Sequence, residues 1–530
     1  MNYALPSYRL AVYSLLLTPF LLLSGCARRP DVLILTLDTT RADRLGCYGH
    51  ALAHTPALDR LAAEGVLFER AQAVMPITLP THATIFTGYL PLEHGLRENR
   101  DYALPPEIPT LAGQFKRAGY DTAAVIASRV LDAKYGLDRG FDSYKDAPPQ
   151  GKGRDAADVT DSVIAWLETR RAARRRAPFM VWAHYFDPHL PRQPHPELAA
   201  AAGSDPYDIE VAYMDRHIAR LLKYLDSRSL TRDTLVVAVG DHGEDLGDHG
   251  EELHGYLLYQ STMHVPLLFR WPGKIKPGRR VAGSVSQTDL MPTILELAGL
   301  PPPRYGSNGT PRPPLLSASF AGTLLKGAPF APRPCHMEAL WTYQRFGWSP
   351  LAGLVEGRWA YILAPQPELY DLEADSGQTR NLHAAEARRA DELAASFEQI
   401  DNAAERREPP KVTVSDDDIR KFAALGYLSG RKSAAGPVNA RHSLTNLPDP
   451  KTRTHVIRAY NRLILVKSVS ATARERLADS LLLAAEFPDK ARYLIHAGRL
   501  YQELGEPDKA RECLERAHAL KPDDTAELLH

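Results

Sequence analysis

The stretch Asp31-Val-Leu-Ile-Leu-Thr-Leu-Asp38 indicates the fold, because it is a nearly continuous apolar run that ends in a carboxylate. Residues 179–187 end in an aspartate in the same way, and residues 234–242 end in Asp241 and His242. Apolar runs of this length are typical of strands buried on both faces of a parallel sheet. Each run therefore predicts a strand that delivers an acid or a histidine to its carboxyl end, where such sheets bind ligands.

Helical stretches separate these strands, among them residues 56–64 and 108–118. Alternating strands and helices predict an α/β sandwich with a mostly parallel central sheet, which we assign to residues 31–428. Shorter strand-like segments occur in residues 350–385, including residues 359–363, and a further helix is expected within residues 411–430. Residues 429–450 are rich in Gly, Ser, Ala, Asn and Pro, which predicts a linker.

The C-terminal residues 451–530 are expected to form a small, wholly helical tail. Within it, residues 491–524 match the tetratricopeptide repeat at nine positions: Leu494, Ala497, Gly498, Tyr501, Gly505, Ala510, Leu514, Ala517 and Pro522. A plain helical hairpin is the alternative. About three repeats are usually needed for independent stability. We therefore expect the tail to pack on the large domain or on another copy of the chain, or to bind a protein partner.

The N-terminus carries an export signal. The apolar run at residues 10–23 is too short and too early for an ordinary membrane-spanning helix, and it leads into Ser-Gly-Cys at Cys26. This ending resembles a bacterial lipobox, which predicts a signal peptide at residues 1–25 and a lipidated N-terminus at residues 26–30. The protein would then be a membrane-anchored lipoprotein on the periplasmic face, and Ala27 favours the outer membrane. An ordinary signal peptide or an uncleaved anchor is the alternative.

The composition excludes several other classes. The chain has 64 basic and 64 acidic residues, so no net charge attracts it to nucleic acid, and no nucleic-acid partner is expected. Besides Cys26, the cysteines are Cys47, Cys335 and Cys513, which are too scattered for a disulfide framework or a cysteine metal site.

The segment from Pro76 to Gly88 contains the candidate nucleophile, Thr78. Pro80 is well placed to begin a helix, so the Thr78 hydroxyl would face the positive end of a helix dipole. A threonine alcohol needs a base or a metal to remove its proton. Protein ligands for such a metal are available at the ends of the predicted strands, namely Asp38, Asp241 and His242. Two carboxylates, an imidazole and the Thr78 oxygen suit Zn or Mn better than Ca.

Residues 31–385 resemble the sulfatase branch of the alkaline phosphatase superfamily. The matching segments follow in order: residues 38–43 with 45–49, 78–88, 241–244 with 247–250, 265–267, and 368–372 with 381–382. The resemblance implies that Asp38, Asp241 and His242 bind a divalent metal and that Thr78 is the nucleophile.

The resemblance also suggests roles for three other residues. Asn99 follows Thr78 at the spacing of an asparagine that binds a substrate oxygen in the phosphodiesterase and phosphonate-ester branches. His254 stands where sulfatases usually carry a substrate-holding lysine. His189, in Asp187-Pro188-His189, resembles a histidine that assists departure of the leaving group.

The departures from the sulfatase pattern are chemically informative. Sulfatases oxidise a cysteine or serine at position 78 to formylglycine, whereas the methyl group on the Thr78 Cβ prevents formation of an aldehyde. His82, a further candidate catalytic residue, replaces the motif's arginine, and Thr39 replaces an aspartate ligand. A threonine nucleophile is instead similar to that of the two-zinc nucleotide phosphodiesterases. Asp187, His189 and His254 are accordingly candidate ligands of a second ion, although the spacing does not reproduce that branch's Asp-x-x-x-His pair.

Three functions follow as hypotheses. The first is a metal-dependent hydrolase of phosphate-type esters (phosphodiesters, phosphomonoesters or phosphonate esters) that uses Thr78. The second is a sulfuric ester hydrolase that uses the same threonine. The third is an inactive scaffold that binds a protein through its repeat tail. The sequence does not distinguish among small-molecule, glycan and lipid ester substrates.

Overall fold

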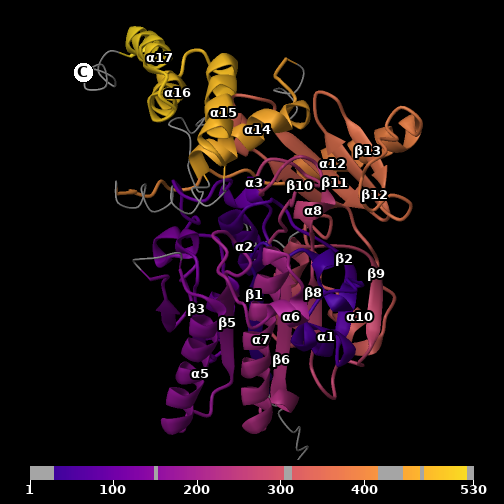
Figure 1. The fold of residues 1–530 in the computed structure, drawn as a ribbon. Helices are drawn as coiled ribbons and strands as arrows, with labels where there is room; N and C mark the ends of the chain where they lie inside the picture. The colour runs from indigo at the N-terminus through magenta and orange to yellow at the C-terminus, as the bar shows by residue number, and fades with distance from the viewer. Residues whose placement is uncertain (1–28, 149–152, 304–312, 416–445, 466–470, 522–530) are drawn as a thin grey trace, which may run out of the picture.

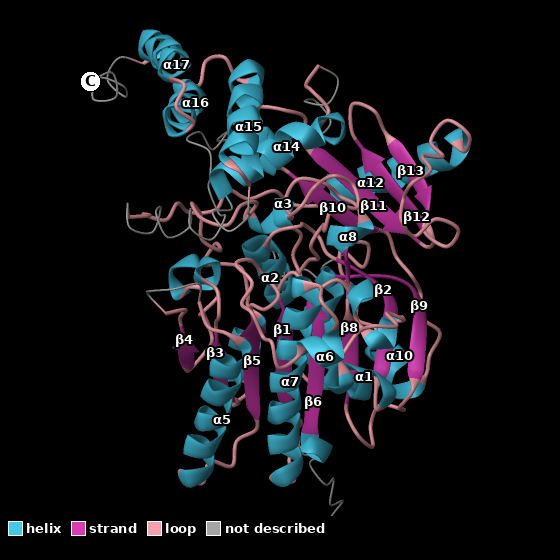
Figure 2. Cartoon of the chain, viewed as in Figure 1, coloured by secondary structure: helices cyan, strands magenta, loops and turns pink. Residues whose placement is uncertain are grey.

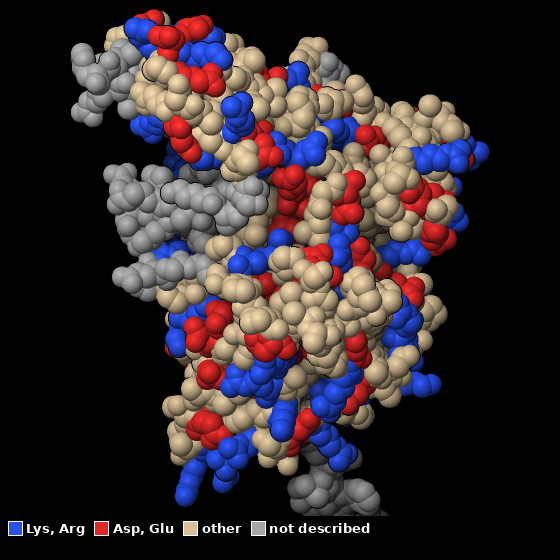
Figure 3. All heavy atoms as spheres, in the orientation of Figure 1, with Lys and Arg blue, Asp and Glu red and all other residues tan. Residues whose placement is uncertain are grey.

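The computed structural model describes residues 29–148, 153–303, 313–415, 446–465 and 471–521. Figure 1 shows a large sheet flanked by helices, a smaller sheet beside one end of it, and a helical tail at that same end. On the face drawn in Figure 3, acidic and basic side chains are interspersed. Among the described residues, no helix is both long enough and apolar enough to cross a membrane.

The large sheet has the predicted parallel centre. The central strand β1 (Asp31–Leu37) lies between β5 (Phe179–Tyr185) and β6 (Thr234–Gly240), and both neighbours run parallel to it. The strand order is β4-β3-β5-β1-β6-β8-β2-β7, with β9 also paired to β2. The outer strands are β2 (Val66–Gln72), β3 (Asp121–Val125), β4 (Ser143–Lys145), β7 (His264–Val265), β8 (Leu267–Arg270) and β9 (Arg279–Ser286). The predicted α/β class is confirmed.

Both faces of this sheet are buried, which explains the continuous apolar runs. Successive side chains of β1 enter two different cores: Val32 and Ile34 lie in one, and Leu33 and Leu35 lie in the other. The first core includes side chains of α2 (Thr78–Thr87), α4 (Leu111–Arg117) and α9 (Leu290–Leu297). The second includes side chains of α1 (Pro56–Ala63), α5 (Ala156–Ala172) and α7 (Pro206–Ser227), which lie along the sheet in Figure 2.

Three helix boundaries differ from the sequence expectation. Helix α1 ends one residue early, because Glu64 is its C-cap. Helix α4 begins at Leu111 rather than at residue 108, because the Thr110 side chain accepts a hydrogen bond from Gly113 N and caps the helix. Helix α2 begins at Thr78 rather than at Pro80, so the candidate nucleophile is the first residue of the helix.

The smaller sheet is antiparallel, in the order β10 (Cys335–Ala339), β11 (Leu351–Glu356), β12 (Trp359–Leu363) and β13 (Glu368–Asp371). Strand β12 has the predicted bounds. Helix α12 (Ala387–Ala403) packs on this sheet. The remaining short helices are α3 (Pro91–His94), α6 (Ala199–Ala202), α8 (Gln260–Met263), α10 (Ala321–Lys326) and α11 (Trp341–Phe346).

The tail is helical throughout its described residues. It contains a 3-10 turn η7 (Pro450–Arg453), then α14 (Thr454–Tyr460), α15 (Ala473–Glu486), α16 (Ala491–Glu503) and α17 (Pro507–Leu520). Helices α16 and α17 pack so closely that a Cβ at Gly498 would lie 2.8 Å from Leu514 Cγ. Side chains of α14 enter the first core of the large domain, so the expected packing on that domain is confirmed.

Several sequence expectations lie outside the described residues. They are the signal peptide at 1–25, the lipidated Cys26, most of the helix expected within residues 411–430, and most of the linker at 429–450.

Candidate metal centre and nucleophile

The candidate metal ligands follow the two paired strands at the centre of the sheet. Asp38 follows β1, and Asp241 and His242 follow β6. Since Leu37 and Gly240 are register partners, the first residues beyond them are brought side by side. One ligand atom from each of the three residues lies within 4.8 Å of the other two, and all three residues are fully buried.

The two carboxylates have the chemistry of a cation site. Asp241 Oδ1 accepts backbone hydrogen bonds from Thr39 at 3.1 Å and His242 at 2.7 Å, and Asp38 Oδ2 lies 3.2 Å from His184 Nε2. The other oxygens, Asp38 Oδ1 and Asp241 Oδ2, are buried and have no hydrogen-bond partner. Burial raises the pKa of both carboxyls well above the ordinary value. A divalent cation would offset this cost and use the two oxygens, so the residues fit a metal.

The imidazole of His242 is oriented for metal binding. Its Nδ1 lies 2.9 Å from the carbonyl oxygen of Gly243, which requires the proton to be on Nδ1. Nε2 is therefore the atom with a lone pair, and it lies 3.5 Å from Asp241 Oδ2. Burial lowers the pKa of His242 well below its usual value, which favours the neutral form that a metal requires.

Thr78 lies at the positive end of helix α2 and faces this centre. Its Oγ1 is 3.4 Å from His242 Nε2, and its side chain is fully buried. The first N–H groups of a helix have no partner within the helix. Asn99 supplies one, since its Oδ1 accepts the Leu79 N–H at 2.8 Å. Asn99 thus lies beside the candidate nucleophile. Because its oxygen binds the backbone, its NH₂ group is the part suited to contact a substrate.

His82 lies behind the nucleophile, one turn along α2. Its Nδ1 is 2.8 Å from the Thr78 carbonyl oxygen and 3.7 Å from Asp241 Oδ2, while its Nε2 is buried without a hydrogen-bond partner. Burial and the neighbouring His184 hold the pKa of His82 well below its usual value. The neutral imidazole of His82 approaches Asp241, a candidate metal ligand, from the protein interior. We therefore expect His82 to support a metal ligand rather than to bind the metal itself.

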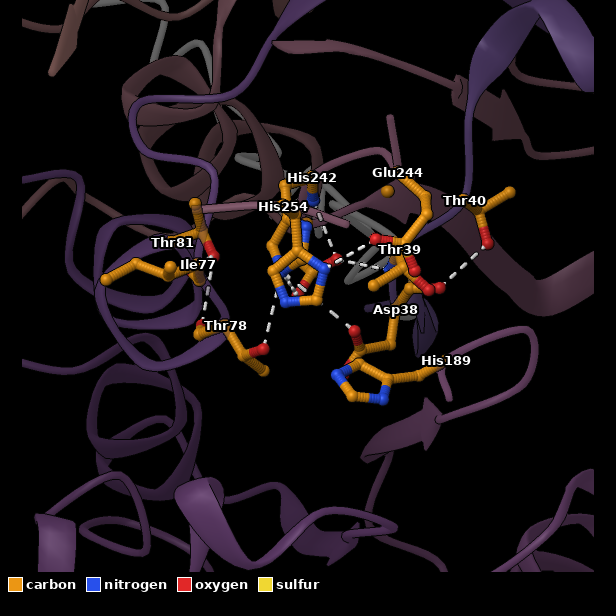
Figure 4. A network of polar contacts seen from close by, with 12 residues as sticks. Asp38, Thr39, Thr40, Ile77, Thr78, Thr81, His189, His242, Glu244 and His254 are labelled. Atoms are coloured by element: carbon orange, nitrogen blue, oxygen red, sulfur yellow. Dashed lines mark hydrogen bonds and ion pairs between the residues drawn. The ribbon is translucent and has the colours of Figure 1, made fainter. Parts of the chain in front are cut away.

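His254 and His189 lie beside His242 (Figure 4). The His254 ring centre is 4.5 Å from that of His242 and 5.2 Å from that of His189. His254 Nδ1 is bound to Glu244 Oε1 at 2.8 Å, and His189 stacks on Phe186 at 4.3 Å. Both imidazoles therefore stand next to the candidate metal centre.

The second-ion hypothesis concerns Asp187, His189 and His254. Across the described parts of the chain, Asp38, Asp241 and His242 are the only group of three such residues whose ligand atoms all lie within 4.8 Å of one another. The second set does not form a group of that kind, and a second ion remains a prediction.

Two buried residues of the site were not predicted. His184 accepts the Ala127 N–H through Nδ1, so its Nε2–H donates to Asp38, and burial lowers its pKa to about 3. It lies inside β5, opposite Thr36, whereas the sequence pattern points only to residues at the ends of strands. Glu244, which is hydrogen-bonded to His254, lies in residues 241–244, one of the segments that resemble the sulfatase branch. Its spacing from Asp241 could have identified it as a site residue.

The comparisons with known proteins identify both parts of the chain. The sulfatase family model matches residues 30–300, just over half of the chain, and a tetratricopeptide repeat model matches residues 491–524, as predicted. The ulvan-active sulfatase of Formosa agariphila is 28% identical over 52% of this chain, and the match spans only 55% of that relative. An N-acetylgalactosamine-6-O-sulfatase of Bacteroides thetaiotaomicron is 25% identical, with 69% of this chain and 94% of the relative covered.

Solved structures are similar in fold. One, in complex with its substrate D-glucosamine-2-N,6-O-disulfate, has a TM-score of 0.60 and 20% identity, with 72% of this chain and 99% of that chain covered. The phosphonate monoester hydrolase of Agrobacterium radiobacter has a TM-score of 0.57 and 23% identity, with 71% and 95% covered. The match to more than half of the chain shows that this protein belongs to the sulfatase family.

Proposed function

We propose that the protein is a metal-dependent ester hydrolase in which Thr78 attacks the central sulfur or phosphorus atom of the substrate directly. The observation that carries the proposal is the position of Thr78 Oγ1, at the N-terminus of α2 and 3.4 Å from His242 Nε2. The family match and the names of the relatives support an ester hydrolase, as the sequence predicts.

In the proposed reaction, each residue of the site has its own role. A divalent cation, for which these donors favour Zn or Mn over Ca, would polarise the substrate and lower the pKa of the Thr78 hydroxyl. The Thr78 hydroxyl releases its proton to solvent, its Oγ1 bonds to the sulfur or phosphorus atom, and the N-terminus of α2 with the Asn99 amide group stabilises the developing negative charge. His254 or His189 donates a proton as the bond to the leaving oxygen breaks. Water then hydrolyses the ester on Thr78 and restores its hydroxyl group.

We propose a sulfated carbohydrate as the first substrate class. The comparisons support the sulfuric ester alternative better than the phosphate ester hypothesis that the sequence argument placed first, because the curated relatives cited are named sulfatases. Thr78 cannot be converted to formylglycine, because the methyl group on its Cβ prevents formation of an aldehyde. The reaction would therefore pass through a sulfate ester of Thr78 that water must cleave at sulfur.

A phosphate-type ester is the second candidate, and the intact hydroxyl of Thr78 favours it. A phosphothreonine can be hydrolysed by water without a formylglycine aldehyde. Asn99 lies beside Thr78, and its NH₂ group can contact a substrate oxygen. The scaffold hypothesis is weaker, because two buried carboxylate oxygens without partners would be costly to keep in a protein that binds no cation.

A parallel hydrolysis assay tests the proposal. Protein spanning residues 27–530 is incubated with nitrophenyl sulfate, nitrophenyl phosphate, bis-nitrophenyl phosphate and a phosphonate monoester, each with Zn, Mn or Ca. We expect turnover with Zn or Mn that falls by on the order of 10³ in Thr78→Ala and is partly kept in Thr78→Ser. Preferred sulfate turnover supports the first substrate class, and preferred phosphorus turnover supports the second. Turnover that persists in Thr78→Ala would overturn the assignment of the nucleophile.

We also propose that Cys26 is lipidated and holds the exported protein to a membrane, on the strength of its lipobox-like sequence. Labelling with a radioactive or alkyne fatty acid in a bacterial host tests this, with Cys26→Ser as the control.

A further inference from the structure

The loop that carries His254 is folded around a buried carboxylate. Glu251 is fully buried, and its two oxygens accept the N–H groups of Tyr256 at 3.0 Å and Leu257 at 3.1 Å. Gly255, directly after His254, has a φ of 105°, a conformation that favours glycine. The position of His254 therefore depends on how the whole segment 249–258 is held.

The helical tail holds this segment from the outside. The Tyr256 hydroxyl donates to Asn461 Oδ1 at 2.5 Å, and both residues are only 2% exposed. A Cβ at Gly250 would lie 3.0 Å from Thr454 Oγ1, so the backbone of the loop also lies against the first residue of α14. Two points of the loop, one on each side of His254, thus contact the tail.

The same part of the tail supports the turn before the nucleophile. Tyr460, the last residue of α14, packs edge-on against Trp341 and Phe346 of α11, with ring centres 5.6 and 5.2 Å apart. Leu340, directly before α11, forms a small buried cluster with Ile77, the residue that precedes Thr78. A continuous set of contacts therefore runs from α14 to the nucleophile.

The two sets of contacts meet at the active site. A Cβ at Gly255 would lie 3.4 Å from Ile77 Cγ2, so the residues adjacent to His254 and Thr78 touch each other. The Tyr256 ring packs edge-on against Trp341 of α11, with ring centres 4.5 Å apart. It therefore links the loop that carries His254 to the contacts that support the turn before Thr78.

We propose that α14 and Asn461 are positioning elements of the active site, which fix His254 relative to Thr78. The first part of the tail would then belong to the catalytic unit, whereas the buried Cys513 and Ala517 of α17 pack only within the tail. This inference deepens the proposed function and rests on it for the expected effect on turnover.

The test compares Asn461→Leu with Asn461→Asp. Leucine removes the acceptor of the Tyr256 hydroxyl, whereas aspartate retains it. Tyr256→Phe removes only the hydroxyl and serves as a milder second variant, and Tyr501→Phe on α16 is the control within the tail. Hydrogen exchange of segment 249–258 is measured in the zinc-loaded full chain, and kcat and KM are measured with the ester preferred by the wild type.

We expect Asn461→Leu and Tyr256→Phe to accelerate exchange in segment 249–258 and to lower kcat by about 10- to 100-fold with little change in KM, because misplacement of a catalytic group affects the chemical step. Asn461→Asp and Tyr501→Phe should resemble the wild type. Faster exchange with unchanged kcat, or unchanged exchange, overturns the inference. The exchange measurement needs no substrate, so a wild type without turnover would refute the proposed function while the contact between the tail and the loop is still tested.

Discussion

At the scale of single residues, the candidate metal centre depends on a residue in an unfavourable backbone conformation. Thr39 has a φ of 47°, which side chains with a branched Cβ rarely adopt. Its N–H binds Asp241, and its carbonyl oxygen accepts the hydroxyl of Tyr207 at 2.7 Å. The same hydroxyl oxygen accepts the Arg41 N–H at 2.9 Å, so Tyr207 fixes the backbone on both sides of Thr40.

We predict that Tyr207→Phe weakens zinc binding by about 10- to 100-fold, because loss of a residue that orients a ligand typically costs this much affinity. A competition titration of the metal-free protein against a fluorescent zinc chelator measures the effect. Tyr144→Phe is the matched control, since its hydroxyl donates to Leu131 O on another part of the fold. An affinity equal to that of the wild type would show that the Thr39 turn holds its shape without Tyr207.

The strand pattern predicted Asp38 and Asp241 at the same edge of the sheet, and the resemblance pointed to Thr78, Asn99 and His254. The structure adds that the two strands before Asp38 and Asp241 are paired. His184 lies inside a strand and Tyr207 lies on a helix 168 positions after Thr39, and no local pattern connects either of them to the metal centre.

At the scale of elements, helix α1 is capped by a side chain from another helix. Asp215 of α7 is fully buried and accepts the Ala57 and Leu58 N–H groups at 2.9 and 2.8 Å. These are N–H groups of the first turn, which have no partner within α1. The N-terminus of α1 was nevertheless predicted correctly at Pro56, whereas the start of α4 was not, because it is set by the local cap at Thr110.

We predict that the contribution of Asp215 to stability declines as the pH rises from about 4 to about 7. Burial raises the pKa of Asp215 to about 7, above its ordinary value of 3.8. An acid whose pKa is raised by folding contributes most below the unfolded pKa and loses that contribution through the folded pKa, with a slope of at most about 1.4 kcal/mol per pH unit. The difference in the free energy of unfolding between wild type and Asp215→Asn, measured with urea in EDTA, should therefore shrink over this range. A constant difference would contradict the titration.

At the scale of the whole molecule, the tail is divided between two packing environments. The buried side chains Val456, Ile457 and Tyr460 of α14 belong to the same core as Val32 of the central strand. The buried Cys513 and Ala517 of α17 belong only to small clusters within the tail.

We predict that α17 opens before α14. Local opening requires less free energy where few apolar contacts must be broken. Native-state hydrogen exchange should therefore find α14 amides protected almost as strongly as those of β1, while α17 amides exchange at least about tenfold faster. Equal protection of α14 and α17 would mean that the tail opens as one unit.

The direction of β1 has a consequence for a protein attached at Cys26. Residue 31 begins this central strand, and its seven residues span about 23 Å before they reach Asp38. The catalytic edge and the docked tail therefore lie at the far end of the molecule from the point where the strand starts (Figure 1). If Cys26 is lipidated as we propose, we therefore expect the candidate site to face away from the membrane that carries the protein.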